Sequence, residues 1–173
     1  MDAARRLAAR EGELSLRGVA AEAGFAPAAL YSYFSGKNDL LLALAAEDMA
    51  YLARAMRDAA TQASPESRLE AAASAALAGL REMESLAAAL AALPPHSGSG
   101  EAERLFNGRL IGALKALSDA SGRPAASRVE QCDVVLLAAA LAGVAMFARA
   151  GRLEALGFDT SEILGRLQAQ FAA

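Results

Sequence analysis

The sequence contains few of the residues that hold small proteins together through covalent or metal bonds. Its 173 residues include one cysteine, one histidine and no tryptophan. The single Cys132 excludes an intrachain disulfide framework and a zinc site built from several thiolates. His96 lies in a segment rich in Pro, Gly and Ser, with no metal-ligating residue at a useful spacing. We therefore expect no metal site and no cofactor.

Targeting and membrane-spanning segments are missing as well. The N-terminus carries charges every few residues and has no apolar stretch of the kind found in signal peptides. The longest apolar run, residues 134–148, is shorter than the roughly 20 residues that a membrane span needs. We expect this run to form a buried core helix, the chain to have no membrane partner, and the protein to be cytoplasmic.

Groups that could perform catalysis are also scarce. With one His and one Cys, the chain has no cluster of candidate nucleophile, base and metal ligand. Acidic pairs such as Glu82 with Glu84, and Glu101 with Glu103, are typical of a solvated helix surface rather than of an acid/base dyad. The sequence therefore argues against an enzyme.

Apolar side chains, by contrast, are abundant and make up 55% of the chain, with alanine prominent among them. Alanine is the best helix former, and no alternating strand pattern of useful length is present. We predict an all-α fold of about nine helices. From residue 40 onward, helices are expected over 40–62, from 64 toward 80 or, after a bend near Gly79, toward 93, then from 103, over 127–149 and at 164–171. Residues 94–100 and 121–124 are predicted loops, and 151–160 a connection.

The most informative stretch is residues 15–44, which predicts a helix, a sharp turn and a short second helix. Leu16, Val19, Ala20 and Ala23 share one helix face by their spacing. Gly24 then suits the left-handed conformation that ends many helices, and Pro27 suits the first position of the next helix. Two helices joined by a short glycine-containing turn form a helix-turn-helix, whose second helix enters the major groove of DNA.

At these residues the chain resembles the TetR family of bacterial transcriptional regulators. The similarity covers about residues 14–44 and rests on residue types at fixed offsets. They are Ser15, Val19-Ala20, Ala23-Gly24, Leu30-Tyr31-Ser32-Tyr33-Phe34, Gly36-Lys37 and Leu40-Leu41. The resemblance implies a three-helix DNA-binding head at residues 1–45 and a larger helical body at 46–173 for ligand binding and dimerisation.

The resemblance also implies which side chains meet double-stranded operator DNA. Arg17, Tyr31, Tyr33 and Lys37 match family positions that touch phosphates or base edges, chemistry that tyrosine hydroxyls and cations supply. The alternative is that the tyrosines are merely half-buried and Lys37 merely solvated. In the recognition segment this chain has alanines at positions where many relatives have polar side chains. Contacts of the alanine methyl groups with thymine methyl groups, and the shape of the DNA, would therefore carry more of the specificity. The full predicted set is Ser15, Arg17, Ala26, Pro27, Ala28, Tyr31, Tyr33 and Lys37.

Charge is unusual for a DNA-binding head. Residues 1–45 contain five cations and five carboxylates, and the whole chain has a net charge of −3. A basic patch is the usual footprint of nucleic-acid binding. Contact must therefore depend on where the few cations lie, and the affinity of each head should be modest, which makes dimerisation more important.

Two further sites are expected in the body. An apolar cavity for an unknown small-molecule effector could be lined by Met49, Met56, Leu80, Met83, Phe106, Leu110 and Phe147, although apolar residues at helical spacing are more often plain core. The resemblance implies a homodimer formed through the last two helices, with Ala138, Ala142, Gly143, Leu164, Leu167 and Phe171 at the interface; packing within the chain is the alternative.

Together these features favour a ligand-responsive transcriptional regulator of the TetR type. The most direct form is a repressor that an apolar effector releases from a palindromic operator, although the residues leave open whether the effector releases or promotes DNA binding. Two alternatives remain: a helical enzyme or small-molecule carrier that uses the cavity, and a dimeric ligand-binding module whose DNA head has weakened.

Overall fold

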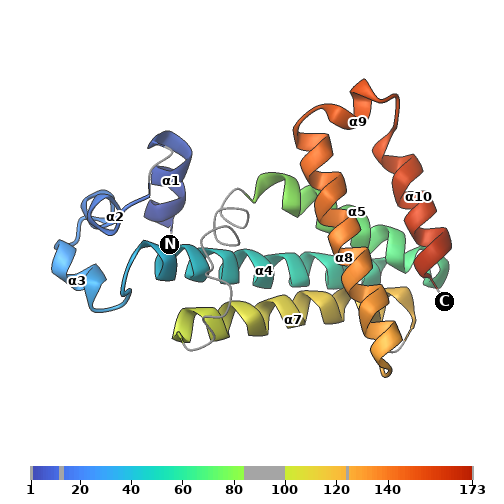
Figure 1. Ribbon diagram of the computed structural model, residues 1–173, viewed down its shortest axis with the longest axis horizontal. Helices are drawn as coiled ribbons and strands as arrows, with labels where there is room; N and C mark the ends of the chain where they lie inside the picture. Colours follow the sequence, from blue (N-terminus) through green and yellow to red (C-terminus); the bar gives the residue numbers. More distant parts are fainter. Residues whose placement is uncertain (1, 12–13, 84–99, 124, 173) are drawn as a thin grey trace. The chain divides into compact units, whose positions relative to one another are not determined.

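The computed structural model describes residues 2–11, 14–83, 100–123 and 125–172, and within these ranges every regular element is a helix (Figure 1). This confirms the predicted all-α class. The elements are α1 Asp2–Glu11, α2 Leu16–Ala23, α3 Pro27–Tyr31, α4 Lys37–Gln62, the 3-10 turn η1 Pro65–Ser67, α5 Arg68–Glu82, α7 Glu101–Ser121, α8 Arg128–Arg149, α9 Arg152–Ala155 and α10 Thr160–Phe171.

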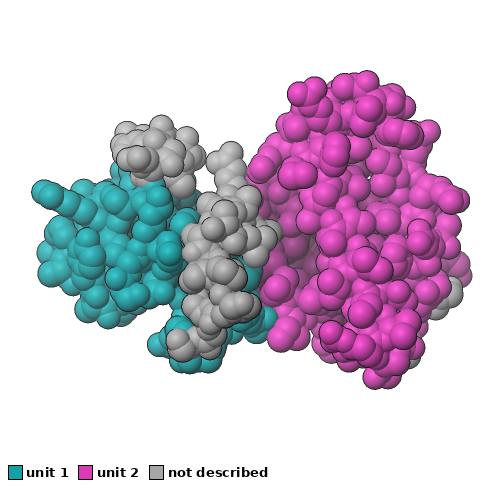
Figure 2. Space-filling view, in the orientation of Figure 1, with its two compact units in different colours: residues 1–48, 84–108 teal, residues 49–83, 109–173 magenta. Residues whose placement is uncertain are grey.

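The chain divides into two compact units, coloured separately in Figure 2. The first comprises residues 1–48 and 84–108, and the second residues 49–83 and 109–173. The long helix α4 contributes its first turns to one unit and its remainder to the other. The division along α4 falls three residues after the expected end of the head at residue 45, while the start of α7, to residue 108, joins the first unit without any sequence signal.

The first unit is built around the packing of α1 on α2 and of α2 on α3. Leu7 of α1 approaches Gly18 of α2 so closely that a Cβ at residue 18 would lie 2.9 Å from the Leu7 Cδ2 atom. Arg5 ties α1 to the first turns of α4, through an ion pair to the buried Asp48 and a second one of 3.1 Å to Glu47. These contacts hold the short helices as one body.

The second unit has its core where α5 packs against α8 and α10. Leu69 and Leu77 of α5, Leu137 and Leu141 of α8, and Leu164 of α10 are all buried. The predicted bend at Gly79 does not occur, because α5 continues to Glu82. The glycine packs closely instead: a Cβ at residue 79 would lie 2.7 Å from Leu52 Cδ1 and would displace this leucine side chain.

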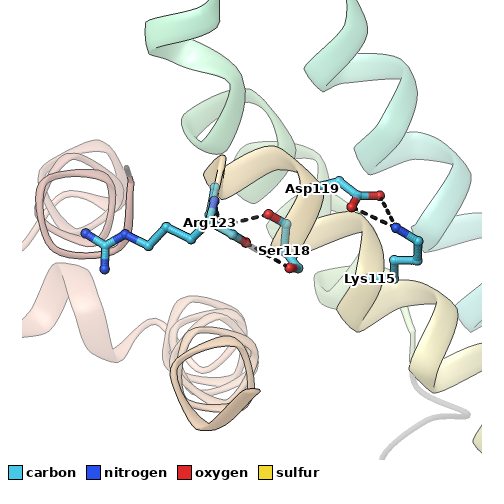
Figure 3. Close-up of polar contacts among 5 residues, drawn as sticks. Lys115, Ser118, Asp119 and Arg123 are labelled. Carbon is cyan, nitrogen blue, oxygen red and sulfur yellow. Dashed lines mark hydrogen bonds and ion pairs between the residues drawn. The ribbon is translucent and has the colours of Figure 1, made fainter. Parts of the chain in front are cut away.

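Helix ends in this unit follow local sequence signals. The predicted capping box at the start of α8 is present, with the Ser127 N–H donating to Glu130 and the Glu130 N–H to Ser127. Between α7 and α8, the Ser118 hydroxyl donates to the Arg123 carbonyl over 3.2 Å (Figure 3). The Arg123 side chain donates a hydrogen bond to the carbonyl of Ala172. The turn therefore also anchors the last helix.

One expectation needs correction, and two others concern residues that lie outside the described ranges. The connection 151–160 contains a short helix, α9, and α10 begins with a second capping box, Asp159 with Glu162. The predicted loop 94–100 and any helix toward residue 93 lie largely in 84–99, outside the described residues.

The prediction that residues 134–148 form a buried core helix is wrong. They belong to α8, which at 22 residues is long and apolar enough, by length and composition only, to cross a membrane. Only 22% of its most apolar window is buried. One face, with Leu137, Leu141 and Ala145, packs inside the unit, while Val135, Leu136 and Met146 are exposed. Because alanines lie on every side of α8, the sequence pattern does not distinguish its buried side from its exposed side.

Candidate nucleic-acid interface

The first part of the candidate interface is the start of α2 and the turn that ends it. Ser15 caps α2, since its hydroxyl oxygen accepts a hydrogen bond of 3.1 Å from the Gly18 N–H. Gly24 ends the helix with φ +74°, the left-handed conformation that the sequence predicts. Arg17, in the first turn, is exposed. The buried Leu16 and Val19 fix the rotation of α2 and so keep Arg17 on the outer side.

The second part is the short helix α3 and the turn that follows it. Pro27 occupies the first helical position, and the backbone N–H groups of Tyr33 and Phe34 donate to the Leu30 carbonyl. Leu30 and Phe34 are half-buried, as their spacing predicts. Tyr31 and Tyr33 are 58% and 82% exposed, so the alternative of half-buried tyrosines does not apply.

The third part is the joint between α3 and α4. Asp39 reaches back to Ser35, accepting a 3.0 Å hydrogen bond from its backbone N–H and another from its hydroxyl. A carboxylate at this place also suits the positive end of the α4 dipole. Lys37 is the first residue of α4 and is exposed. Because the joint is closed by these bonds, the position of Lys37 relative to Tyr33 is set by the backbone.

Ion pairs divide those cations of the head whose side chains are described into two groups. Arg6 is bonded to Glu22 over 3.0 Å, and Arg5 to Glu47 and Asp48, where burial lowers and the two carboxylates raise its pKa, with a net rise. No such pair involves Arg17 or Lys37 within the described residues. In the described part of the head, the neutral sum of charges thus conceals two free cations, at two of the positions predicted to touch DNA.

The small residues of the predicted set are also at the surface. Ala26, Pro27 and Ala28 are exposed, so their carbon atoms are available for contact. Phe25, which the sequence reasoning did not single out, is 62% exposed in the turn between α2 and α3. Its signal was its position directly after Gly24, where the chain leaves the helix and no packing position is available.

The head carrying these side chains has known relatives. Residues 1–44 match the family described as bacterial regulatory proteins, tetR family. The N-terminal region of this chain is therefore similar to the TetR family, and we call residues 1–44 the TetR-family head. The match covers the three short helices and the start of α4, so the TetR-family head includes every residue of the candidate interface.

Solved structures show that the fold beyond the TetR-family head is also known. The fatty acid degradation regulator FadR from Bacillus halodurans has a TM-score of 0.62 at 20% identity, covering 98% of this chain and 94% of that one. A protein of unknown function from Rhodococcus sp. RHA1 gives 0.71 at 23%, covering 97% and 89%. SCO4313, described as a proposed regulatory protein, gives 0.66 at 21%, covering 98% and 91%. No curated protein matches the chain.

The residues predicted to line an effector cavity fall in different surroundings. Met49, Met56, Met83 and Phe106 are buried, and Leu80 and Leu110 are half-buried. Phe147 is 43% exposed on α8. Phe106 belongs to the first compact unit and the others to the second. The cavity therefore stays a prediction, and the exposure of Phe147 argues for a different role.

The residues predicted for dimerisation divide by helix. On α8, Ala142 is exposed, and Ala138 and Gly143 are half-exposed. On α10, Leu164 is buried, and Leu167 and Phe171 are half-buried where α10 packs on α5 and α8 of its own chain. The exposed residues of α10 are Ser161, Glu162, Gly165, Arg166, Ala169 and Gln170. The dimer interface on these two helices therefore stays a prediction.

Proposed function

We propose that the chain is a homodimeric transcriptional regulator that binds operator DNA through its TetR-family head in the cytoplasm. The observation that carries the proposal is the placement of polar groups on the head. Tyr31, Tyr33, Arg17 and Lys37 are all exposed, and the two cations have no ion pair among the described residues. Tyrosine hydroxyls and free cations are the groups that bind phosphate oxygens and base edges.

The finer part of the proposal concerns regulation. A small apolar effector binds in the helical body and favours a conformation in which two heads no longer fit two half-sites of a palindromic operator, which makes the protein a repressor. Helix α4 is suited to carry this change, because a single helix contributes to both compact units and begins at Lys37.

The test compares two exposed tyrosines. Tyr33→Ala removes a hydroxyl in the proposed interface, where the side chain is 82% exposed, and Tyr51→Ala removes one from a tyrosine that is 59% exposed in the second unit. Binding of the wild-type protein to its own upstream DNA is measured by fluorescence anisotropy against an unrelated fragment of equal length. Since a hydrogen bond to a charged group is worth about 1.5–3 kcal/mol, we expect Tyr33→Ala to weaken specific binding at least tenfold and Tyr51→Ala to leave it unchanged.

Two results would count against the proposal. Equal affinity for the upstream and the unrelated fragment would show a head that does not recognise a sequence. A folded dimer that binds neither fragment would favour the alternative of a ligand-binding module with a weakened head, which the zero net charge of residues 1–45 suggests.

A further inference from the structure

The turn that ends α2 and the first residues of α3 form an apolar surface on the head. Phe25 is 62% exposed, and Ala26, Pro27 and Ala28, which follow it, are exposed as well. We call these four residues the apolar tip. From residue 24 to residue 30, no side chain has a group that can donate or accept a hydrogen bond. The side chains of this part of the head can therefore recognise a partner only by apolar contact.

Packing within the chain does not account for the large side chain at residue 25. The Phe25 N–H donates to the Ala20 carbonyl over 2.8 Å and Gly24 has a positive φ, which is the geometry of a Schellman motif. An apolar residue at this place in the motif frequently packs back on the helix that it ends. The side chain of Phe25 lies mostly in solvent instead. Because backbone hydrogen bonds close the turn, the turn itself needs no large side chain here.

The neighbours of the apolar tip along the chain indicate what covers it. Arg17 lies in the first turn of α2 and Lys37 begins α4; both are exposed, and neither has an ion pair among the described residues. Tyr31, at the end of α3, is exposed as well. Cations and tyrosine hydroxyls suit phosphate oxygens. An apolar surface between such groups in the chain suits a polyanion with apolar contact points better than it suits a lipid or an apolar protein.

DNA offers one such apolar contact point in its major groove. Base pairs present hydrogen-bond donors and acceptors there, and thymine adds its C5-methyl group. In a helix-turn-helix, the first residues of the second helix are the ones that meet base edges. In this chain those residues are Ala26, Pro27 and Ala28, and Phe25 directly precedes them. The chemistry of the apolar tip thus matches thymine methyl groups, and Phe25 offers the largest apolar side chain for the contact.

From these observations we infer that Phe25 is a specificity-determining residue, which packs on the C5-methyl groups of thymines in the major groove of the operator. Ala26 and Ala28 are small enough to let the backbone approach the base edges, and their own methyl groups add smaller contacts. The inference rests on the proposed function and adds the feature of the bases that the head reads. Phe25 lies outside the set of DNA-contacting residues that the sequence predicts.

Deoxyuridine tests the inference, because its base lacks the C5-methyl group of thymine and keeps every hydrogen-bonding group. The upstream DNA is amplified with dUTP in place of dTTP, and fluorescence anisotropy measures binding of the wild-type protein to both forms. Burying one methyl-sized group is worth a factor of about four in affinity. With one methyl group at each head, the dimer should bind the uracil form about 15-fold more weakly. Equal affinity for the two forms would overturn the inference.

Two variants show whether Phe25 makes this contact. In Phe25→Ala the weakening on uracil DNA should fall to about fourfold or less, because only the smaller contacts of Ala26 and Ala28 remain. Phe158→Ala is the matched control and should keep the wild-type ratio. Phe158 is 55% exposed in the second unit, follows a glycine of positive φ, and donates its N–H to the Leu153 carbonyl over 3.0 Å in the same turn geometry. Because each ratio compares two DNA forms on one protein, differences in folding or dimerisation between variants cancel.

A third form of the DNA separates methyl contact from DNA shape. 5-Bromodeoxyuridine has at C5 a bromine atom of about the size of a methyl group, so amplification with its triphosphate restores the bulk that uracil lacks. The bromine form should recover most of the lost affinity, and a bromine form as weak as the uracil form would overturn the inference. Since an apolar contact is insensitive to salt, the ratio for thymine and uracil forms should stay constant between about 50 and 200 mM salt while both affinities fall.

The outcomes separate this inference from the proposed function. A wild-type protein that prefers its upstream DNA to an unrelated fragment, but binds the thymine and uracil forms equally, contradicts only the role of Phe25. Equal binding to the upstream and the unrelated fragment contradicts recognition of an operator and the inference with it. Weaker binding by Phe25→Ala with an undiminished ratio would indicate a side chain wedged between base steps, and would also overturn the inference.

Discussion

Salt dependence offers the sharpest test of how the head holds DNA. Among the described residues, each head has two exposed cations without ion pairs, Arg17 and Lys37, and a dimer therefore has four. Each phosphate neutralised contributes about −0.9 to the slope of log K against log salt concentration. The wild-type protein should thus show a slope of about −3.6, which corresponds to a loss of affinity of roughly 150-fold between 50 and 200 mM salt.

Removing one of these cations should change the slope by a known amount. Lys37→Ala deletes two contacts per dimer, so the slope should fall to about −1.8 and the loss over the same salt range to roughly 12-fold. Lys115→Ala is the matched control, since Lys115 carries the same charge but is paired with Asp119 in the second unit. The assay is fluorescence anisotropy on the upstream DNA at four salt concentrations. Equal slopes for wild type and Lys37→Ala, or an equal change in Lys115→Ala, would refute the assignment of Lys37 to a phosphate.

Two further predictions concern the stability of the elements that position these surfaces. Gly24→Ala should destabilise the head by about 1–2 kcal/mol, because an alanine is strained at the left-handed φ of +74°. No atom of the described residues lies near enough to residue 24 to clash, so this strain is the whole effect. Gly36→Ala is the control: residue 36 has no positive φ, and the variant should be close to neutral in the same thermal melt. At the start of α8, a hydrogen bond from the Ser127 N–H lowers the pKa of Glu130 below its ordinary value of 4.5. Glu130 therefore stabilises the fold above about pH 4.5 and loses this effect as the pH falls through its lowered pKa, so the melting temperatures of wild type and Glu130→Gln should converge between about pH 6 and 3. A constant difference over that range would contradict the role given to the carboxylate.

Much of the head could be predicted from the sequence, because its signals are local. Gly24, Pro27 and the face shared by Leu16 and Val19 each specify a backbone conformation or a burial pattern within a few residues. The capping box of Ser127 and Glu130 is equally local and was also correct. The exposure of Tyr31 and Tyr33 followed from the inward spacing of Leu30 and Phe34, which bracket them.

What the sequence did not reveal depends on contacts between distant segments. The sequence suggests a helix bend at Gly79, whereas the structure shows Leu52 beside it, and the burial of Leu164 in the core of its own chain also depends on distant segments. The ion pair of Arg6 with Glu22 joins two helices, so the counts of charges in the head gave no hint of which cations are free. In α8, alanines on every face weakened the periodic signal that separates its buried and exposed sides.

The low net charge of the head makes the proposed homodimer important for DNA affinity. With two free cations per head among the described residues, a single head gains little from the phosphate backbone, and the net charge of −3 adds mild repulsion. Linking two such heads turns the second contact into an intramolecular one, which can raise overall affinity by about 10²–10⁴ without any new contact. DNA binding then depends on whether the dimer is intact. The exposed Val135, Leu136 and Met146 of α8 carry no charge, so a dimer interface that used them would be insensitive to salt, whereas the head contacts would be strongly salt-dependent. Occupancy of DNA can therefore be controlled through the heads while the dimer itself persists.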